Sequence, residues 1–339
     1  MSGYRIAIVG ATGLVGQTLL EVLHDQEVPI STLVALARDA GGRFIEFQGE
    51  RIPVEPLDRM DWRRVDVAFF AAGNAVSDMY APQAMRAGVT VIDKSSRFRM
   101  DAGVPLVVPE VNGSAIGDSL IIASPNCSTI QLVIALAPIH RRFGITRVVV
   151  STYQAVSGTG RDAVSELEHQ TRQYLAGAQV TPEVYPVPIA HNVLAFCDNF
   201  GEADYTGEEW KLVRESEKIL GQNVKLSATA VRVPVYIGHS ESVYVETGDD
   251  WSLEEMRQVL KTGPSVRLVD DPGRGVVPTP LDAAGRDEVL VGRVRRDLHE
   301  ERGLHLFVVA DNLRRGAATN AVDIMRSVHQ RWGIGDQSR

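Results

Sequence analysis

Two cysteines in the 339-residue chain, Cys127 and Cys197, are the natural candidates for nucleophilic chemistry. Cys127 lies in the polar string Ser-Pro-Asn-Cys-Ser-Thr, directly after an apolar run at 120–123 and before an expected helix. A helix N-terminus stabilises a thiolate, so this position favours a reactive sulfur over an inert buried one. Cys197 lies in the apolar string Leu-Ala-Phe-Cys and is expected to be buried and unreactive.

Several charged and titratable residues could assist a nucleophilic cysteine, as its base or as ligands of its substrate. A nucleophilic thiolate is usually paired with a base, and His239 is the best candidate among the eight histidines because it follows a glycine in a turn expected between two strands. Arg232 stands alone on an alternating strand and needs a carboxylate or phosphate, from the protein or from a ligand. Glu208 and Lys211 share a helix face, either as a surface ion pair or as ligands. Arg99 is either an anion ligand or a loop charge.

A glycine-rich string, Gly10-Ala11-Thr12-Gly13-Leu14-Val15-Gly16, lies between the first expected strand and the first expected helix. Main-chain N–H groups at such a helix start can hold a pyrophosphate, so the string predicts dinucleotide binding. The second strand ends at Arg38, where NAD-binding domains usually carry an acid. Arg38 favours the 2′-phosphate of NADP. The alternative is that Arg38 is a solvated charge and Asp39 binds the ribose of NAD.

The elements that must position these residues fall into two groups. Short apolar runs separated by helical stretches are typical of βαβ units, and they occur at 6–9, 32–36, 65–70, 89–92 and 120–123. After an uncharged helix expected at 128–140, alternating strands are expected at 146–154, 228–235 and 242–246. Helices are expected at 161–175, at 208–220 and from Ser252, which has Glu255 three residues later as a capping box. A loop is expected at 177–188 and a last amphipathic helix at 317–332.

The predicted fold class is therefore α/β, with an N-terminal doubly wound parallel sheet of Rossmann type and a second α+β domain. We expect the first domain to comprise 1–127 plus 317–339, and the second to comprise 128–316. A chain of this length is long enough for two separate apolar cores.

Composition excludes several other classes of protein. Lys+Arg is 35 and Asp+Glu is 43, a net charge of −8, and the chain has no long basic cluster, which disfavours nucleic acid as a partner. The cysteines lack the spacing of a disulfide framework or a metal site. The uncharged stretch 119–140 is broken by the polar string around Cys127, so no membrane span is expected. The N-terminus has too few apolar residues for a secretory signal, and we expect a cytoplasmic protein.

Taken in order along the chain, the motifs resemble those of the aspartate-semialdehyde dehydrogenase family. They are the glycine-rich string at 10–16, Ser-Pro-Asn-Cys-Ser-Thr at 124–129, Tyr-Gln-Ala-Val-Ser-Gly-Thr-Gly at 153–160, Arg232 and Pro234 with His-Ser-Glu at 239–241, Val-Gly-Arg-Val-Arg at 291–295, and the string from Asp311 to Asn320. The resemblance runs nearly end to end, and the order of the motifs makes it specific.

The resemblance implies roles for individual residues. It implies Cys127 as the nucleophile, His239 as the acid/base and Gln154 as the residue that orients the substrate. The substrate-binding residues that it implies are Arg99, Asn126, Glu208, Lys211 and Arg232. The residues that it implies around NADP are Gly10, Ala11, Thr12, Gly13, Leu14, Val15, Arg38, Gly73, Ser157, Gly158 and Asn312. No metal is implied.

The resemblance also implies an activity. This is the reversible, NADP-dependent reductive dephosphorylation of 4-phospho-L-aspartate to L-aspartate 4-semialdehyde through a cysteine thioester, in the biosynthesis of lysine by way of diaminopimelate, of threonine and of methionine. It further implies a homodimer formed through the second domain. The chain departs from the family at Ala37 and Ala71, where serine is frequent, and at 195–200, a segment with no expected role.

The sequence disfavours three other functions. An enzyme acting on N-acetyl-glutamyl phosphate shares the fold, but its cysteine motif resembles Pro-Gly-Cys-Tyr, not Pro-Asn-Cys-Ser. A catalytically silent NADP-binding paralogue would not need Cys127, Gln154, Arg232 and His239 together. A short-chain reductase would need a Tyr-x-x-x-Lys pair, which the sequence lacks.

Overall fold

The computed structural model describes residues 3–221 and 224–332. The chain divides into two compact units. Unit 1 takes the described residues up to Asn126 and those from Ala317 onward, and unit 2 runs from Cys127 to Gly316. No helix of the described chain is long and apolar enough to cross a membrane.

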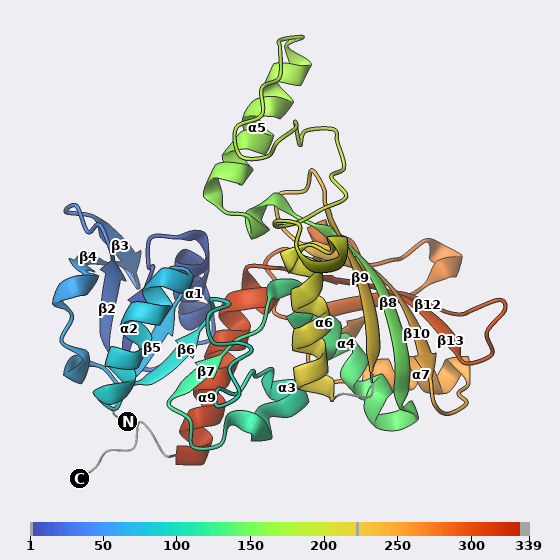
Figure 1. Cartoon of the computed structure of the whole chain (residues 1–339), viewed down its shortest axis with the longest axis horizontal. Coiled ribbons are helices and arrows are strands. Elements are labelled where there is room, and N and C mark those ends of the chain that lie inside the picture. The colour runs from blue at the N-terminus through green and yellow to red at the C-terminus, as the bar shows by residue number, and fades with distance from the viewer. Residues whose placement is uncertain (1–2, 222–223, 333–339) are drawn as a thin grey trace. The chain divides into compact units, whose positions relative to one another are not determined.

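Unit 1 is built on a seven-stranded sheet with the order β3-β4-β2-β1-β5-β6-β7 (Figure 1). Its strands are β1 (Tyr4–Val9), β2 (Ile30–Ala37), β3 (Phe44–Phe47), β4 (Glu50–Pro56), β5 (Val67–Phe70), β6 (Thr90–Asp93) and β7 (Ile121–Ala123). All neighbours are parallel except β3 and β4. The helices are α1 (Leu14–Asp25), α2 (Asn74–Arg86), the short α3 (Pro109–Asn112) and α9 (Asn320–Trp332). The predicted doubly wound sheet is confirmed.

The hairpin of β3 and β4 was not among the predicted elements. Its two strands carry no continuous apolar run, and only alternate side chains, such as Ile45 and Phe47, are buried. The connecting residues Gln48 and Gly49 have φ of 52° and 82°, the left-handed pair of a two-residue hairpin turn. A Gln-Gly turn is a weak sequence signal, so the hairpin was missed.

Unit 2 is built on a six-stranded mixed sheet with the order β11-β12-β13-β10-β8-β9. Its strands are β8 (Ile145–Gln154), β9 (Lys225–Arg232), β10 (His239–Thr247), β11 (Val266–Leu268), β12 (Val289–Arg296) and β13 (Gly303–Ala310). The longer helices are α4 (Cys127–Phe143), α5 (Arg161–Leu175), α6 (Gly207–Leu220) and α7 (Leu253–Lys261), and a four-residue helix, α8 (Pro280–Ala283), precedes β12. Strand β10 is antiparallel to both of its neighbours, as expected for an α+β domain.

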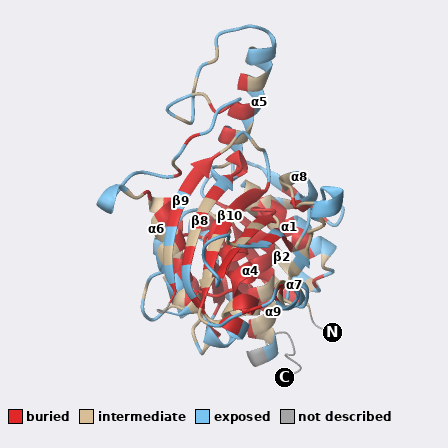
Figure 2. Cartoon of the chain, turned by 90° about the vertical axis from the view of Figure 1, so that its right-hand side faces the viewer, coloured by how far each residue is buried: buried red, intermediate tan, exposed pale blue. Residues whose placement is uncertain are grey.

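Helix α4 lies over the sheet of unit 2, in contact with α6 and α7 (Figure 1). Figure 2 shows that α4 is largely buried, whereas the outer part of α5 is exposed. Helix α7 has the predicted capping box, in which Ser252 and Glu255 bond each other's main chain. The inner face of the sheet therefore carries the residues that pack against α4.

Several predicted boundaries differ from the structure, and three of these differences have a clear physical reason or consequence. Strand β9 ends at Arg232, before Pro234, because proline has no N–H to continue a ladder. His239 does not lie in the turn: Gly238 has φ 99° and completes the turn, and His239 is the first residue of β10. The last helix was expected to begin at 317, but a π-helical turn, η7 (Arg314–Thr319), precedes α9.

Candidate active site

The sulfur of Cys127 lies at the start of α4, in contact with His239 at the start of β10. The distance from Sγ to Nε2 is 3.2 Å. His239 is fully buried, whereas Cys127 is partly accessible. Gly316 lies directly against the cysteine, since a Cβ at that position would be 2.9 Å from Cys127 Cβ. The first turn of α4 contains no acidic residue, so its dipole favours a thiolate at this position.

The other ring nitrogen of His239 faces a main-chain donor. The N–H of Ala155, which follows β8, donates to Nδ1 at 3.0 Å. Burial lowers the pKa of His239 well below its usual value, and the charge of Arg232 lowers it further. The imidazole is therefore neutral at neutral pH.

Arg232, the last residue of β9, is buried and bonded to the same peptide. Its guanidinium donates to the carbonyl oxygen of Ala155 at 2.7 Å, whereas its Nε has no partner among the described residues. Gly158 lies against both groups, because a Cβ there would be 3.0 Å from His239 Cε1 and 3.1 Å from a nitrogen of Arg232. The cation and the imidazole thus share one small region of unit 2.

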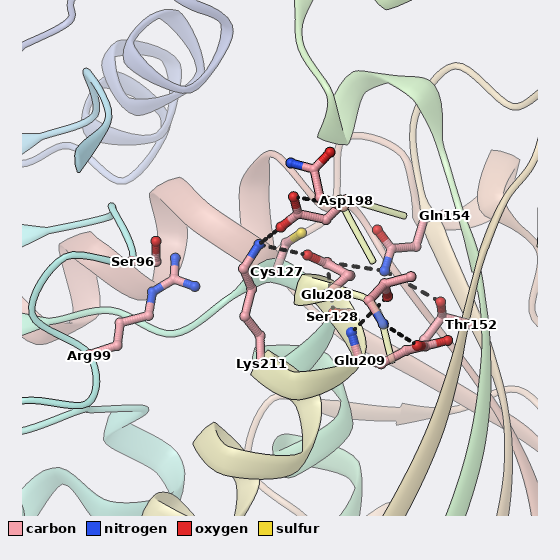
Figure 3. Close-up of polar contacts among 12 residues, drawn as sticks. Ser96, Arg99, Cys127, Ser128, Thr152, Gln154, Asp198, Glu208, Glu209 and Lys211 are labelled. Atoms are coloured by element: carbon pink, nitrogen blue, oxygen red, sulfur yellow. Dashed lines mark hydrogen bonds and ion pairs between the residues drawn. The ribbon is translucent and has the colours of Figure 1, made fainter. Parts of the chain in front are cut away.

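A chain of polar contacts joins β8, α4 and α6 on the same side of the sheet (Figure 3). The side-chain amide of Gln154 donates to Glu208 Oε1 at 3.1 Å, and Ser128 donates to the same oxygen at 3.4 Å. The ammonium of Lys211 lies 3.1 Å from Glu208 Oε2 and 2.9 Å from Asp198 Oδ2. Burial alone would raise the pKa of Glu208, but Lys211 and Gln154 hold it below its usual value. Glu208 is 6% exposed, so its pair with Lys211 is not a solvated surface contact.

Two of the residues expected near the cofactor, Ser157 and Asn312, bond each other in unit 2. The amide nitrogen of Asn312 donates to Ser157 Oγ at 2.9 Å. The amide oxygen of Asn312 accepts the N–H of Gly238 at 2.9 Å, directly before His239. Asn312 therefore fixes the turn that presents the histidine.

The glycine-rich string lies in unit 1 and joins β1 to α1. Gly10 has φ 91°, and a Cβ there would be 2.7 Å from the carbonyl oxygen of Ala71, so only glycine fits. A Cβ on Gly16 would be 2.2 Å from the carbonyl oxygen of Gly10. Gly13 begins α1 without a side-chain cap among the described residues, and the first turn has no acid. This uncapped helix start, closely approached by main chain, fits the pyrophosphate of a dinucleotide.

The remaining residues expected at the cofactor in unit 1 lie at the carboxyl ends of strands. Arg38 follows β2 and is exposed. Asp39, the alternative ribose ligand, has a carboxylate oxygen 3.4 Å from a nitrogen of Arg43. Gly73 precedes α2 with φ 86°, and a Cβ there would meet open space. In doubly wound sheets, ligands bind outside the carboxyl ends of the strands, which is where all three lie.

Arg99 and Asn126, which the resemblance implies as substrate ligands, are buried residues of unit 1. Arg99 donates to the carbonyl oxygen of Lys94 at 2.7 Å, and the ammonium of Lys94 donates to Ser124 Oγ at 2.9 Å. Both residues therefore belong to the unit that carries the glycine-rich string, whereas Cys127, Gln154, Glu208, Lys211, Arg232 and His239 belong to unit 2.

Cys197 is 3% exposed, and burial raises the pKa of its thiol to about 12. A thiol with this pKa is not ionised at neutral pH, so Cys197 is a poor nucleophile.

Sequence reasoning missed several polar groups of this region. Asp198 lies in a segment to which no role had been assigned, and its contact with Lys211 spans thirteen positions of sequence. Ala155 contributes main-chain groups, which leave no trace in residue type. Gln131 donates to the carbonyl oxygen of His239 at 3.3 Å from within a helix that reads as apolar. Of these residues, only Asp198 has a feature that the sequence shows, because it is a lone acid between aromatic residues.

Comparison with known proteins agrees with this arrangement. Residues 5–119 match the family model described as "Semialdehyde dehydrogenase, NAD binding domain". Residues 136–315 match the model described as "Semialdehyde dehydrogenase, dimerisation domain".

Relatives of known name cover nearly the whole chain. The aspartate-semialdehyde dehydrogenase of Aquifex aeolicus is 49% identical over 329 residues, which are 95% of this chain and 97% of the relative. That of Bacillus subtilis is 44% identical over 96% of this chain and 97% of its own. A crystal structure of aspartate semialdehyde dehydrogenase II from Vibrio cholerae, complexed with ASA, has a TM-score of 0.95 at 42% identity and covers 98% of this chain and 100% of its own.

Proposed function

The chain belongs to the aspartate-semialdehyde dehydrogenase family, and from this premise we propose that it reduces 4-phospho-L-aspartate to L-aspartate 4-semialdehyde, reversibly, through a thioester on Cys127. It is an oxidoreductase with a nicotinamide cofactor. The observation that carries the proposal is the 3.2 Å contact between Cys127 Sγ and His239 Nε2, at a helix start whose first turn has no acidic residue. The products would supply the biosynthesis of lysine, threonine and methionine.

The thiolate of Cys127 attacks the acyl carbon of the acyl phosphate, a C–S bond forms, and the C–O bond to phosphate breaks. A sulfur suits this exchange because it is both a good nucleophile and a good leaving group. His239, in contact with the sulfur, would lie near the oxygen on which charge develops. A nicotinamide cofactor, held by the glycine-rich string of unit 1, would supply the hydride chemistry needed to reduce the thioester.

Different charged residues around the cysteine would bind different groups of the substrate. Arg232 would hold the α-carboxylate and Glu208 the amino group, with Gln154 orienting the acyl group between them. Lys211, with Arg99 and Asn126, would hold the phosphate. This assignment is supported by burial, since Arg232 and Glu208 are 7% and 6% exposed and a ligand there is desolvated.

We propose NADP as the cofactor. The groups that would hold it are the glycine-rich string 10–15, Arg38 and Gly73 in unit 1, and Ser157, Gly158 and Asn312 in unit 2. Arg38 supports NADP over NAD because an exposed guanidinium at the end of β2 suits a 2′-phosphate. Asp39 already has a cationic neighbour in Arg43.

We also propose that unit 2 forms a homodimer through the outer face of its sheet. Tyr153 is 37% exposed there and lies against Phe307, with ring centroids 6.3 Å apart. Tyr244 of β10 and His305 of β13 form a second ring pair, with centroids 5.1 Å apart. A sheet face that exposes aromatic rings suits an interface between like subunits.

The test of the proposed function is the phosphate-dependent formation of NADPH from aspartate 4-semialdehyde. We expect Cys127→Ser to abolish it and Cys197→Ser, the matched control, to retain it. Mass spectrometry of the intact enzyme with acyl phosphate, in the absence of reductant, should show an adduct at Cys127. Loss of activity in the Cys197 variant alone, or an adduct elsewhere, would refute the assignment.

A further inference from the structure

Two carboxylates already hold the ammonium of Lys211, the side chain that the resemblance implies as a phosphate ligand. We propose that one of them, Asp198, competes with phosphate for Lys211 and thereby weakens the binding of inorganic phosphate, so that phosphate leaves the site readily. This proposal rests on the proposed function, because that reaction releases phosphate in one direction and consumes it in the other.

The first observation is the charge around Lys211, which lies between Asp198 and Glu208 (Figure 3). Its Nζ is 2.9 Å from Asp198 Oδ2 and 3.1 Å from Glu208 Oε2. Burial alone would raise the pKa of Asp198, but hydrogen bonds from Lys211 and from the N–H of Asn199 hold it below its usual value, so this carboxyl is ionised at neutral pH. One cation therefore faces two anions, and the negative charge of phosphate is repelled by the second of them.

Of the two carboxylates, Asp198 is the one that an incoming anion can displace. Glu208 is buried, and its other oxygen accepts hydrogen bonds from Gln154 and Ser128. The side chain of Asp198 is 38% exposed, and in the described chain the only side chain that it bonds is that of Lys211. Because Lys211 is also partly exposed, phosphate can reach the ammonium and replace the Asp198 oxygen while Glu208 stays in place.

The fold provides a specific place for the Asp198 carboxylate. Asp198 has φ 69°, a left-handed conformation that strains most residues but that Asp and Asn tolerate. Its carboxylate lies against Gly207, the first residue of α6, because a Cβ there would be 2.6 Å from Asp198 Oδ2. Four residues earlier, Leu194 exchanges main-chain hydrogen bonds of 3.0 and 2.8 Å with Arg232 of β9. The carboxylate is thus held at a helix start, beside a cation, in a place that suits phosphate equally well.

A purely positioning role for Asp198 makes the opposite prediction. If the carboxylate served to direct the ammonium at phosphate, its loss would weaken phosphate binding. Glu208, however, holds the ammonium from one turn earlier on the same helix, so Lys211 keeps a fixed partner without Asp198. Removal of the Asp198 charge then leaves the cation in place and relieves the repulsion. The sign of the change in phosphate affinity decides between the two roles.

The test is Asp198→Asn in the phosphate-dependent formation of NADPH from aspartate 4-semialdehyde. Asparagine matches aspartate in size and tolerates the left-handed conformation, but it carries no charge. We expect the KM for phosphate to fall about tenfold, an effect between those of an exposed and of a buried ion pair. The KM for the aldehyde should change by less than about twofold, because the charge of Asp198 is compensated in its absence only towards phosphate at Lys211.

Two controls separate an effect of charge from an effect of structure. Asp204→Asn removes one acid from the same segment before α6, at an exposed residue with φ 60°, and should leave the KM for phosphate at the wild-type value. Raising KCl from about 0.05 M to about 0.5 M shortens the screening length, so it should shrink the difference between Asp198→Asn and the wild type. A purely structural effect would not depend on salt in this way. Titration calorimetry with inorganic phosphate measures the same affinity without turnover.

A phosphate affinity of Asp198→Asn that equals or falls below the wild-type value would overturn the inference, as would an equal gain in Asp204→Asn. Such a result in an enzyme that oxidises aspartate semialdehyde would leave the proposed function standing. If the wild type formed no NADPH from the aldehyde, the proposed function would fall, and the calorimetric difference would still decide whether Asp198 competes with phosphate for Lys211.

Discussion

Replacing Glu241 with glutamine is expected to stabilise the protein, increasingly so as the pH rises. Glu241 lies on β10 and is fully buried, and neither of its carboxylate oxygens has a hydrogen-bond partner among the described residues. Burial raises the pKa of this carboxyl well above its usual value, although the nearby Gln131 side chain opposes the shift. The folded protein therefore keeps a proton on Glu241 that the unfolded chain releases above about pH 4.5.

The sign follows from proton linkage. Because the folded state binds more protons than the unfolded state above the ordinary pKa, the contribution of Glu241 is fully present below that pKa and is lost as the pH rises towards the folded pKa. Each pH unit in that window costs about 1.4 kcal/mol of unfolding free energy. The unfolding free energy of the wild type therefore falls as the pH rises through this window, and the Tm falls with it. Glutamine has no proton to lose and avoids this cost.

The assay is thermal unfolding of the wild type and of Glu241→Gln at several pH values, followed by circular dichroism and by scanning calorimetry. The difference in Tm between variant and wild type should grow as the pH rises from 5 to 7. Glu217→Gln, an exposed change on α6, is the control for loss of one acid from the surface. A difference for Glu241→Gln that stays constant with pH, or shrinks, would refute the reasoning.

Two further predictions concern the cofactor and the geometry of the sulfur. Arg38→Asp should weaken NADP binding by tenfold or more relative to NAD binding, as measured by titration calorimetry. An equal loss of affinity for both cofactors would show that Arg38 does not bind the 2′-phosphate. Gly316→Ala should displace Cys127, since its Cβ would meet Cys127 Cβ at 2.9 Å and the cost of such overpacking is about 1–3 kcal/mol. Its Cys127 alkylation rate should fall at least tenfold, whereas Gly103→Ala, where a Cβ meets open space, should match the wild type.

Local sequence signals predicted the strands of unit 1 that carry apolar runs, but β11, β12 and β13 of unit 2 were not predicted, although β12 and β13 are rich in valine and leucine. The five apolar runs of unit 1 each overlap one of the strands β1, β2, β5, β6 and β7, and α5 has the predicted bounds 161–175. The hairpin β3–β4 was not predicted because its burial alternates and its turn depends on the φ of Gln48 and Gly49. The π-helical turn η7 also lacks a local signal.

The candidate site was predictable only where residue types carry the chemistry. Cys127, His239, Arg232 and Glu208 are charged or titratable residues in unusual surroundings, and unit 2 brings them to one side of its sheet. The hydrogen bond that fixes the ring of His239 comes from a main-chain N–H, and any residue except proline could supply it. Such contacts depend on where β8 ends relative to β10, which periodicity does not determine.

The electrostatic balance of the site explains how a thiolate can exist beside an uncharged histidine. Two features favour the anion: the dipole of α4 and the guanidinium of Arg232 in the same region. The buried carboxylate of Glu208 would disfavour a second negative charge on Cys127, but Lys211 compensates its charge. Because Glu241 stays neutral, it adds no negative charge beneath the ring. A site arranged in this way favours a thiolate on Cys127 without a cationic histidine beside it.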